Sequence, residues 1–471
     1  MSNTNIIAAI VLGSSKITGI VGSKEIDNSI RVKAHVAVQS SDFVGKGRVL
    51  NVEKMAASLA NIKAHLEEQS GYRIKCFYAA IDCQGMRSHT NDVSIQFPSS
   101  EIVTDDMLSS ICVRNKEGNP ADRDILEAIP LEYRLGAQGT HTSLEPKGMQ
   151  TDKLQAKFLN VTCNSNAIAT ILTCFRKANI EIAGGRLCIA AEQLASAVTT
   201  EQERTSGCAF VDMGSETTTV AIYKNKLLRH FIVIPLGSAN ITRDIVNVFN
   251  VEQDEAENFK LTYGYPDMET IDDKEEIHLR DGGRVKKLAE LADIIDARVE
   301  EIVQNIKHQV DLSGYTNETL VNGLYVCGGG AQLKNIQSAF KAHFKDWNVR
   351  IIKNAIRLNV VCHEAKFNES GIYSTCLALI DNGDVNCYGG DYQGLFEPEP
   401  TAEELEAQRK AEEEARQAEE AAKKAEEEAR IAAEEAARKA EEEKKKPKGP
   451  SAISKFFKSV GEWGKNLVSE D

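Results

Sequence analysis

The sequence predicts an α/β fold with two similar lobes, and three observations lead to that prediction. First, a strand, a tight turn rich in glycine and hydroxyl groups, two further strands and a helix follow one another from Ile6 and again from Phe210. Second, another strand follows the helix in each half, at residues 76–81 and 324–327. Third, the 471 residues suffice for several domains or for one large two-lobed fold. Such a duplication predicts two halves face to face, with one turn from each side of a shared cleft.

The first half begins with the apolar run 6–12, which is typical of a buried strand. Gly13-Ser14-Ser15-Lys16 then turns the chain, and residues 17–21 return it as a second strand. Residues 31–38 are the third predicted strand. A helix is predicted over 52–69, because apolar side chains recur there at helical spacing.

The second half repeats this order. An apolar strand ends in Asp212 and is followed by the turn Gly214-Ser215-Glu216-Thr217-Thr218. Two strands, 219–223 and 227–234, and a helix over 241–249 come next. A turn of this composition can aim backbone N–H groups and hydroxyls at one point, where phosphate is the usual occupant. An acid such as Asp212 can hold a metal ion or its water shell. A single turn of this kind could equally be an ordinary hairpin rich in hydroxyl groups. Its occurrence in both halves favours the interpretation as a phosphate-binding turn.

The strand 324–327 runs directly into Gly328-Gly329-Gly330, and an amphipathic helix is predicted to start there. Glycines after a core strand allow a ligand to lie close to the backbone. A plain tight turn is the alternative.

Two segments do not fit the repeat. Residues 84–160 contain polar turns and suggest a small α+β insertion in the first half, and 250–312 form a second insertion that ends in a long helix over 285–310. We therefore expect seven segments. In chain order they are the start of the first lobe at 1–83, the first insertion at 84–164, the end of the first lobe and start of the second core at 165–240, and the second insertion at 241–312. They continue with the end of the second core at 313–396, a charged helical linker at 397–450 and a terminal helix at 451–471.

The composition excludes several classes of protein. A net charge of −14 argues against broad nucleic-acid binding. The eleven cysteines are scattered singly, which predicts reduced thiols rather than a zinc site or a disulfide framework. No apolar run reaches the length of about 18 residues that a membrane span needs.

Residues 401–446 consist almost entirely of Ala, Glu, Lys and Arg. Apolar heptads are missing, and Glu-to-basic pairs four residues apart recur, which predicts a solitary solvated helix rather than a coiled coil. Pro447 and Pro450 would end it.

The last segment, 451–468, has the pattern of an amphipathic helix. Its apolar side chains fall within an arc of roughly 140° at 100° per residue, and its lysines lie opposite, beside Glu462. This pattern suits a helix that lies in the interface of an anionic membrane. A protein groove is the alternative occupant of the apolar face. The predicted membrane-binding residues are Ile453, Phe456, Phe457, Val460, Trp463, Leu467 and Val468 on the apolar face and Lys455, Lys458 and Lys465 on the basic one.

Taken together, the two turns, the triple glycine and the insertions resemble the actin/Hsp70/sugar-kinase superfamily and, within it, the bacterial cell-division FtsA family. The insertion at 84–160 stands where this family carries its own subdomain, whereas actin carries its subdomain at a different place in the chain. The resemblance implies an actin-like two-lobed fold, a duplicated RNase H-like architecture. The segments that carry it, in order and spacing, are Ile129–Tyr133, Pro146–Met149, Val211–Thr218, Ile234–Ile245, Ala297–Ile302 and Val326–Gly330.

The resemblance also implies roles for individual residues. ATP and Mg2+ are the expected cofactors, with Asp212 on the metal's water shell. Glu257 and Lys260 match the pair that reaches the ribose in the family. The expected cofactor-binding set is Gly13, Ser14, Ser15, Lys16, Asp212, Gly214, Ser215, Glu216, Thr217, Thr218, Glu257, Lys260, Gly328, Gly329 and Gly330.

One position departs from the family pattern. The family usually has Asp two residues before the first turn glycine, where this chain has Val11. Loss of that carboxylate is expected to weaken Mg2+ placement and hydrolysis more than nucleotide binding, because the backbone donors remain.

The preferred function is a structural adaptor, at most a weak ATPase. The family implies self-assembly into filaments, binding of the FtsZ C-terminal tail within 241–312, contacts with other division proteins, and peripheral attachment to the cytoplasmic face of the inner membrane at the division site. An actin-fold kinase is the enzyme alternative, but we find no Asp placed as a general base. An Hsp70-like chaperone would need a β-rich domain where this chain has a charged helix.

Overall fold

The fold is described from a computed structural model, which covers residues 5–136, 138–139, 141–265, 275–353, 357–362, 364, 367 and 371–391. All of these belong to one compact unit, Met1–Gln393. The predicted linker and terminal helix, with their lysines and apolar residues, lie outside the described residues. None of the helices in the described ranges is long and apolar enough to cross a membrane.

The first lobe is built on a seven-stranded sheet. Its centre repeats the predicted order, because β1 pairs antiparallel with β2 and parallel with β7, while β2 pairs antiparallel with β3. The strands are β12 (Glu181–Ile182), β7 (Cys76–Ile81), β1 (Ile6–Leu12), β2 (Lys16–Lys24), β3 (Ile30–Gln39) and β21 (Val360–Val361) in spatial order, with β13 (Cys188–Ile189) also paired to β7.

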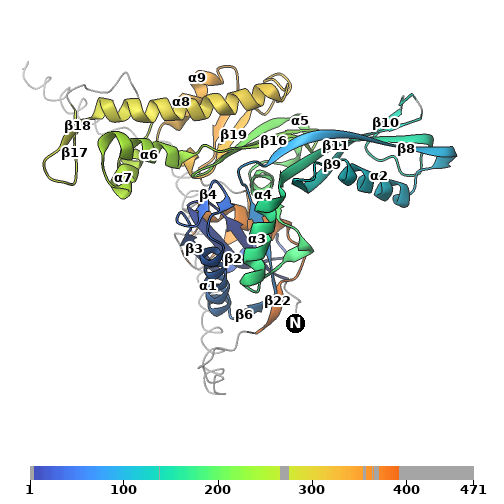
Figure 1. Ribbon diagram of the computed structural model, residues 1–471, viewed down its shortest axis with the longest axis horizontal. Coiled ribbons are helices and arrows are strands. Elements are labelled where there is room, and N and C mark those ends of the chain that lie inside the picture. Colours follow the sequence, from blue (N-terminus) through green and yellow to red (C-terminus); the bar gives the residue numbers. More distant parts are fainter. Residues whose placement is uncertain are drawn as a thin grey trace, which may run out of the picture. The chain divides into compact units, whose positions relative to one another are not determined.

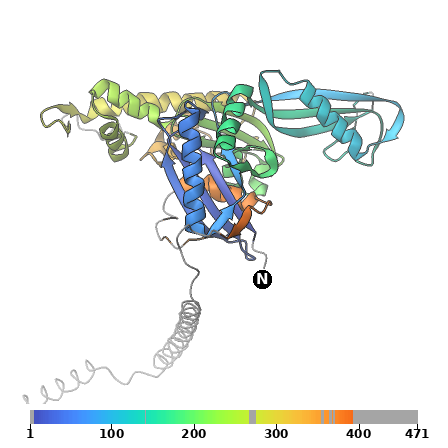
Figure 2. The same cartoon turned by 60° about the horizontal axis from the view of Figure 1, so that its bottom comes forward.

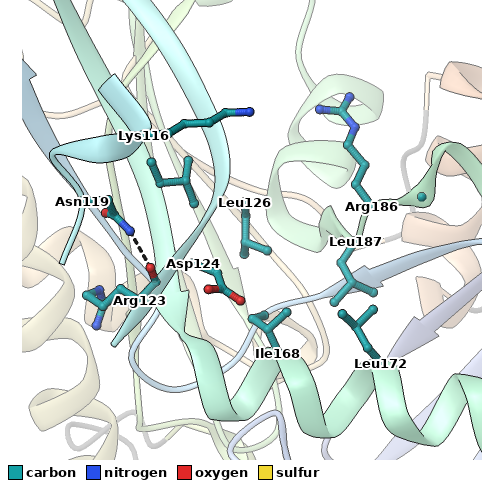
Figure 3. Close-up of a pocket in the computed structure, with 11 residues that line it drawn as sticks. Lys116, Asn119, Arg123, Asp124, Leu126, Ile168, Leu172, Arg186 and Leu187 are labelled. Atoms are coloured by element: carbon teal, nitrogen blue, oxygen red, sulfur yellow. Dashed lines mark hydrogen bonds between the residues drawn. The ribbon is translucent and has the colours of Figure 1, made fainter. Parts of the chain in front are cut away.

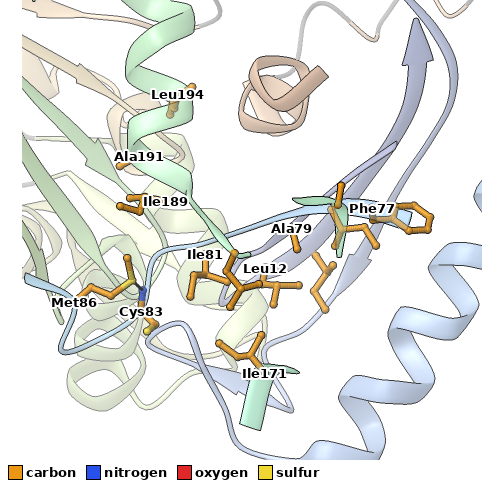
Figure 4. Packing of buried hydrophobic residues seen from close by; sticks show 14 of the residues in the cluster. Leu12, Phe77, Ala79, Ile81, Cys83, Met86, Ile171, Ile189, Ala191 and Leu194 are labelled. Carbon is orange, nitrogen blue, oxygen red and sulfur yellow. Dashed lines mark hydrogen bonds between the residues drawn. The ribbon is translucent and has the colours of Figure 1, made fainter. Parts of the chain in front are cut away.

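Alternate residues of β1 point into two different cores. Ile6, Ala8, Ile10 and Leu12 face the side covered by α1 (Val52–Ser70) and α3 (Ser165–Lys177). Ile7 and Ala9 face the side of α10 (Ser374–Asn382). Figure 4 shows part of the first core, in which Leu12, Phe77 and Ile171 gather. Burial on both faces explains why this strand reads as a continuous apolar run.

The second lobe repeats this arrangement. Here β14 pairs antiparallel with β15 and parallel with β19, and β15 pairs antiparallel with β16. Helix α8 runs across this sheet (Figure 1). The elements are β14 (Cys208–Met213), β15 (Thr218–Lys224), β16 (Leu227–Ile234), β19 (Leu324–Cys327), β20 (Val349–Ile351), α6 (Ser238–Phe249), α7 (Gln253–Tyr263), α8 (Leu288–Leu312) and α9 (Ile336–His343). The predicted two-lobed α/β fold is therefore confirmed.

The inserted segment forms a sheet with its own small core, which includes Ile111, Tyr133 and Phe158. It projects from the rest of the described unit (Figure 2). Its long strand β8 also reaches the second lobe, where Arg87 pairs with Ile232 of β16. The strands of the insertion therefore extend the second-lobe sheet, although the insertion lies in the first half of the sequence. Its elements are β8 (Arg87–Ile102), α2 (Asp105–Glu117), β9 (Arg123–Leu135), β10 (His141–Ser143) and β11 (Gln150–Asn164).

Two helices begin later than the sequence predicts. Residues 285–287 form β18, which pairs with β17 across a turn containing Gly282 at φ +78°, so α8 starts at Leu288. The last of the three glycines, Gly330, begins a single 3₁₀ turn at 330–332, and α9 starts only at Ile336.

The remaining elements are short. They are β4 (Val44–Gly45), β5 (Arg48–Val49), β6 (Tyr72–Ile74), α4 (Ala190–Val198), α5 (Glu201–Ser206), β17 (Glu276–His278), β18 (Val285–Lys287) and β22 (Tyr388–Asp391).

Candidate functional site

The first predicted phosphate turn joins β1 to β2. The N–H of Gly13 donates to the carbonyl of Lys16 at 3.1 Å, which closes the turn. A Cβ on Gly13 would lie 2.5 Å from that same oxygen, so only glycine fits. Ser14 Oγ accepts from the N–H of Gly47 at 2.8 Å, and Ser40 Oγ donates to the carbonyl of Gly13 at 2.7 Å. The turn is therefore held in place by the loop that carries β4 and β5.

The second turn has the same closure. The N–H of Gly214 donates to the carbonyl of Thr217 at 2.8 Å, and a Cβ on Gly214 would lie 2.8 Å from that oxygen. The start of α6 supports this turn, since the N–H of Ser238 donates to the carbonyl of Gly214 at 3.1 Å and that of Ala239 to the carbonyl of Ser215 at 2.7 Å. The two turns thus share the same closing hydrogen bond, and each is supported by its own lobe.

The triple glycine lies against the strand end that leads into the second turn. Gly328 has φ +91°, and a Cβ there would meet Asp212 Oδ1 at 2.2 Å. A Cβ on Gly330 would lie 2.9 Å from the Cβ of Met213. Gly329 is different, because a Cβ there would meet none of the described residues within 4 Å. The backbone of this loop therefore lies close to Asp212 and Met213, and the predicted approach of a ligand to the glycines stays a prediction.

Two hydrogen bonds cross between the lobes beside the turns. The N–H of Lys46 donates to Glu216 Oε2 at 2.6 Å, while Arg243 pairs with Glu216 Oε1. Thr219 Oγ1 of β15 donates to Asp82 Oδ2 at 2.9 Å. The predicted turns are therefore brought to the same part of the molecule, and Glu216 already bridges the two lobes there.

The register of the two sheets explains the role of Val11. Val11 pairs with Thr18 and Ala80, as Asp212 pairs with Thr219 and Cys327. Val11 therefore occupies the position in the first lobe that Asp212 occupies in the second. Its side chain packs against the apolar core beneath α10.

Asp212 is half-buried, and burial raises the pKa of its carboxyl to about 6. A second acid that the sequence analysis missed, Asp82, stands directly after β7. Burial and then the charge of Asp212 raise the pKa of Asp82 well above its ordinary value. The signal was present in the sequence, because Asp82 follows the first-lobe strand that corresponds to β19.

The predicted ribose pair lies on α7. Lys260 Nζ donates to Glu257 Oε2 at 2.7 Å, to Thr242 Oγ1 at 3.0 Å and to the carbonyl of Ser238 at 3.3 Å. These three acceptors use all three N–H donors of the ammonium group. Burial lowers the pKa of Lys260, and the Glu257 carboxylate opposes that shift. Lys260 therefore joins α7 to α6, and a ribose contact is left chiefly to Glu257, whose side chain is 42% exposed.

The predicted second-lobe residues form one connected group. Ser238 contacts both the second turn, through its N–H, and Lys260, through its carbonyl. At the other end of α7, the N–H of Tyr265 donates to the carbonyl of Lys334 at 2.8 Å, close to the triple glycine. The turn, α7 and the glycine loop thus support one another.

A hollow of about 390 Å³ lies away from these residues, between the insertion and α3 (Figure 3). Its walls carry Lys116, Arg123 and Arg186 beside Leu126 and Leu172. Arg123 already donates to the carbonyls of Gly85 and Thr162. None of the lining residues belongs to the predicted site.

No group of three or more His, Cys, Asp or Glu in the described ranges is arranged to hold a metal ion. Mg2+ does not require one, because it usually keeps several waters and takes one or two carboxylates together with the phosphates of a nucleotide. The chemistry of the two turns and Asp212 fits that pattern.

Comparison with known proteins shows two family matches. The model described as "Cell division protein FtsA" matches residues 209–378, and the one described as "SHS2 domain inserted in FTSA" matches 84–162. The chain is 27% identical over 334 residues to the cell division protein FtsA of Pseudomonas aeruginosa, covering 70% of this chain and 78% of the relative. It is 25% identical over 359 residues to FtsA of Bacillus subtilis, covering 74% and 79%.

Among solved structures, the chain resembles one from the PilM-PilN type IV pilus biogenesis complex. The TM-score is 0.56 at 14% identity, over 79% of this chain and 97% of that one. At this identity the likeness concerns the fold alone, which is the actin-like one.

Substitution of Gly328 by alanine tests the packing of the glycine loop. Gly328→Ala places a Cβ 2.2 Å from Asp212 Oδ1 at a positive φ, so we expect a loss of about 1–3 kcal/mol in the free energy of unfolding. Denaturant unfolding followed by circular dichroism measures it. Gly329→Ala is the matched control, because Gly329 has φ −61° and open space at its Cβ. Equal stabilities of the two variants would contradict this packing.

Proposed function

We propose that this chain, which belongs to the FtsA family of cell division proteins, binds ATP, polymerises and anchors the FtsZ ring to the inner face of the cytoplasmic membrane. The observation that carries the proposal is the repeated turn. Both turns close through the same glycine hydrogen bond, and a Cβ at either glycine would collide with the turn itself. Two such turns, one on each lobe, are suited to hold the phosphates of one nucleotide.

Different groups of residues would contact the phosphates, the adenosine and the metal ion of the nucleotide. The turns at 13–16 and 214–218 offer backbone N–H groups and hydroxyls to the phosphates, and the backbone of 328–330 is open to the adenosine at Gly329. Asp212 would serve the water shell of Mg2+, which supplies charge neutralisation for the phosphates. Since burial has raised the pKa of Asp212, a nearby cation would favour its ionised form.

Binding of the FtsZ C-terminal tail is proposed for residues 241–312, which contain all but the first three residues of α6, together with α7, the β17–β18 hairpin and α8. This region exposes large apolar side chains, among them Val248 at 56% and Leu261 at 55%. Apolar side chains on exposed helices suit a short peptide with apolar anchors. Polymerisation and contacts with other division proteins belong to the same proposal.

Membrane attachment is proposed for the amphipathic segment 451–468. Changing Phe456 and Phe457 to Glu puts two charges on its apolar face, and we expect release from vesicles of phosphatidylglycerol and phosphatidylethanolamine, measured by co-sedimentation. Deletion of 451–471 should have the same effect. Ser451→Glu with Ser454→Glu adds the same charge to the polar side and should reduce binding far less. Unchanged co-sedimentation of the Phe456/Phe457 variant would rule out this attachment.

ATP turnover is expected to be slow, because Val11 leaves the first lobe without a carboxylate at the position equivalent to Asp212. The purified protein should bind a fluorescent ATP analogue yet release phosphate with a kcat well below about 1 s⁻¹, measured with a phosphate sensor. Protein heated to unfolding is the background control. A kcat above that value would favour the phosphotransferase alternative over the adaptor.

A further inference from the structure

We propose that Asp82 supplies the second carboxylate of the cation site between the lobes and helps to place the Mg2+ that an acid at the position of Val11 would otherwise hold. The proposal rests on the proposed function, in which Mg2+ accompanies ATP beside the two turns. It identifies which residue of this chain compensates for its departure from the family pattern.

The register of the first lobe places Asp82 beside the first turn. Ala80 of β7 lies opposite Val11 of β1 in a parallel pair, and Leu12 lies opposite Ile81. Asp82 is the next residue and therefore lies level with Gly13, where β1 enters the turn. An acid that is missing from one strand is thus present at the end of the neighbouring strand.

The contacts of Asp82 hold its carboxylate beside Thr219, the cross-strand partner of Asp212. Asp82 Oδ2 accepts from Thr219 Oγ1 at 2.9 Å and from the N–H of Ala191 at 3.0 Å. Thr219 is the direct cross-strand partner of Asp212. Side chains of such partners lie on the same face of the sheet, with Cβ atoms about 5 Å apart. Asp82 of the first lobe and Asp212 of the second therefore flank one threonine.

The other oxygen of Asp82 has no partner of its own. Oδ1 is buried and accepts no hydrogen bond from any described residue. Burying a carboxylate oxygen without a partner is costly, and native structures supply one from protein, water or an ion. A hydrated cation between Asp82 and Asp212 would satisfy this oxygen and offset the repulsion between the two acids.

A purely structural role of Asp82 would require different properties of its side chain than a role in binding a cation. A residue that only joined the lobes would need the Oδ2 contacts to Thr219 and Ala191, and an uncharged amide could provide them. A cation site needs the negative charge. Asp82→Asn and Thr219→Val therefore separate the two roles, because the first removes the charge and the second removes the contact between the lobes.

The measurement is the affinity of full-length protein for a fluorescent ATP analogue, once with Mg2+ and once with EDTA, together with the melting temperature. We expect Asp82→Asn to reduce the gain from Mg2+ by about tenfold and to leave the affinity in EDTA nearly unchanged. Thr219→Val should keep most of the gain. Val11→Asp added to Asp82→Asn should restore it, and Asp106→Asn, at an exposed position, is the matched control.

Each outcome decides the proposal. If the original protein gains affinity from Mg2+ and Asp82→Asn keeps that gain, the proposal is wrong and the proposed function stands. If Thr219→Val loses as much as Asp82→Asn, the role of Asp82 is structural. If the original protein gains nothing from Mg2+, the metal part of the proposed function fails first. Should Asp82→Asn melt early, the affinities with Mg2+ and with EDTA are compared at a temperature at which this variant is still folded, and the same outcomes support or overturn the proposal.

Discussion

The hydrogen bond that closes each turn, from the glycine N–H to the carbonyl three residues later, is the constraint on which the rest of the site depends. It forces glycine at 13 and 214, and it sets the direction in which each strand pair leaves the turn. Each lobe then builds its own support around that turn, from the β4–β5 loop in one and the start of α6 in the other. Each turn is fixed within its own lobe. The placement of one turn relative to the other therefore depends on a few contacts between the lobes, namely Lys46 with Glu216 and Asp82 with Thr219.

Those few contacts place charge where the two lobes meet. The negative charge of Glu216 is balanced by a backbone N–H and by Arg243. The negative charges of Asp82 and Asp212 are balanced only in part, and burial raises the pKa of both carboxyls. A cation between the two acids would favour their ionised forms and offset the repulsion between them. In the account proposed here, bound nucleotide and its metal tie the lobes together, and the output of that binding is assembly at the membrane rather than fast chemistry.

Local patterns predicted the repeated strands well, because buried apolar runs and glycine turns are both readable in a single sequence. Cys76–Ile81 and Leu324–Cys327 appear as strands with the predicted bounds. Features that depend on long-range pairing were missed. The insertion joins the second-lobe sheet through one pair, Ile232 with Arg87. The sequence places Asp82 after a core strand, but its position level with the first turn follows from the parallel register of β7 with β1. The late start of α8 likewise follows from a hairpin whose two strands are too short to read from sequence.

The central claim is that one nucleotide is held by both turns and by the glycine loop. Hydrogen–deuterium exchange of the full-length protein, with and without ATP and Mg2+, tests it most directly. The account predicts slower exchange at 13–16, 214–218 and 328–330 together, and little change in the insertion at 84–162. Protection confined to one lobe, or absent from all three segments at saturating ATP, would contradict it.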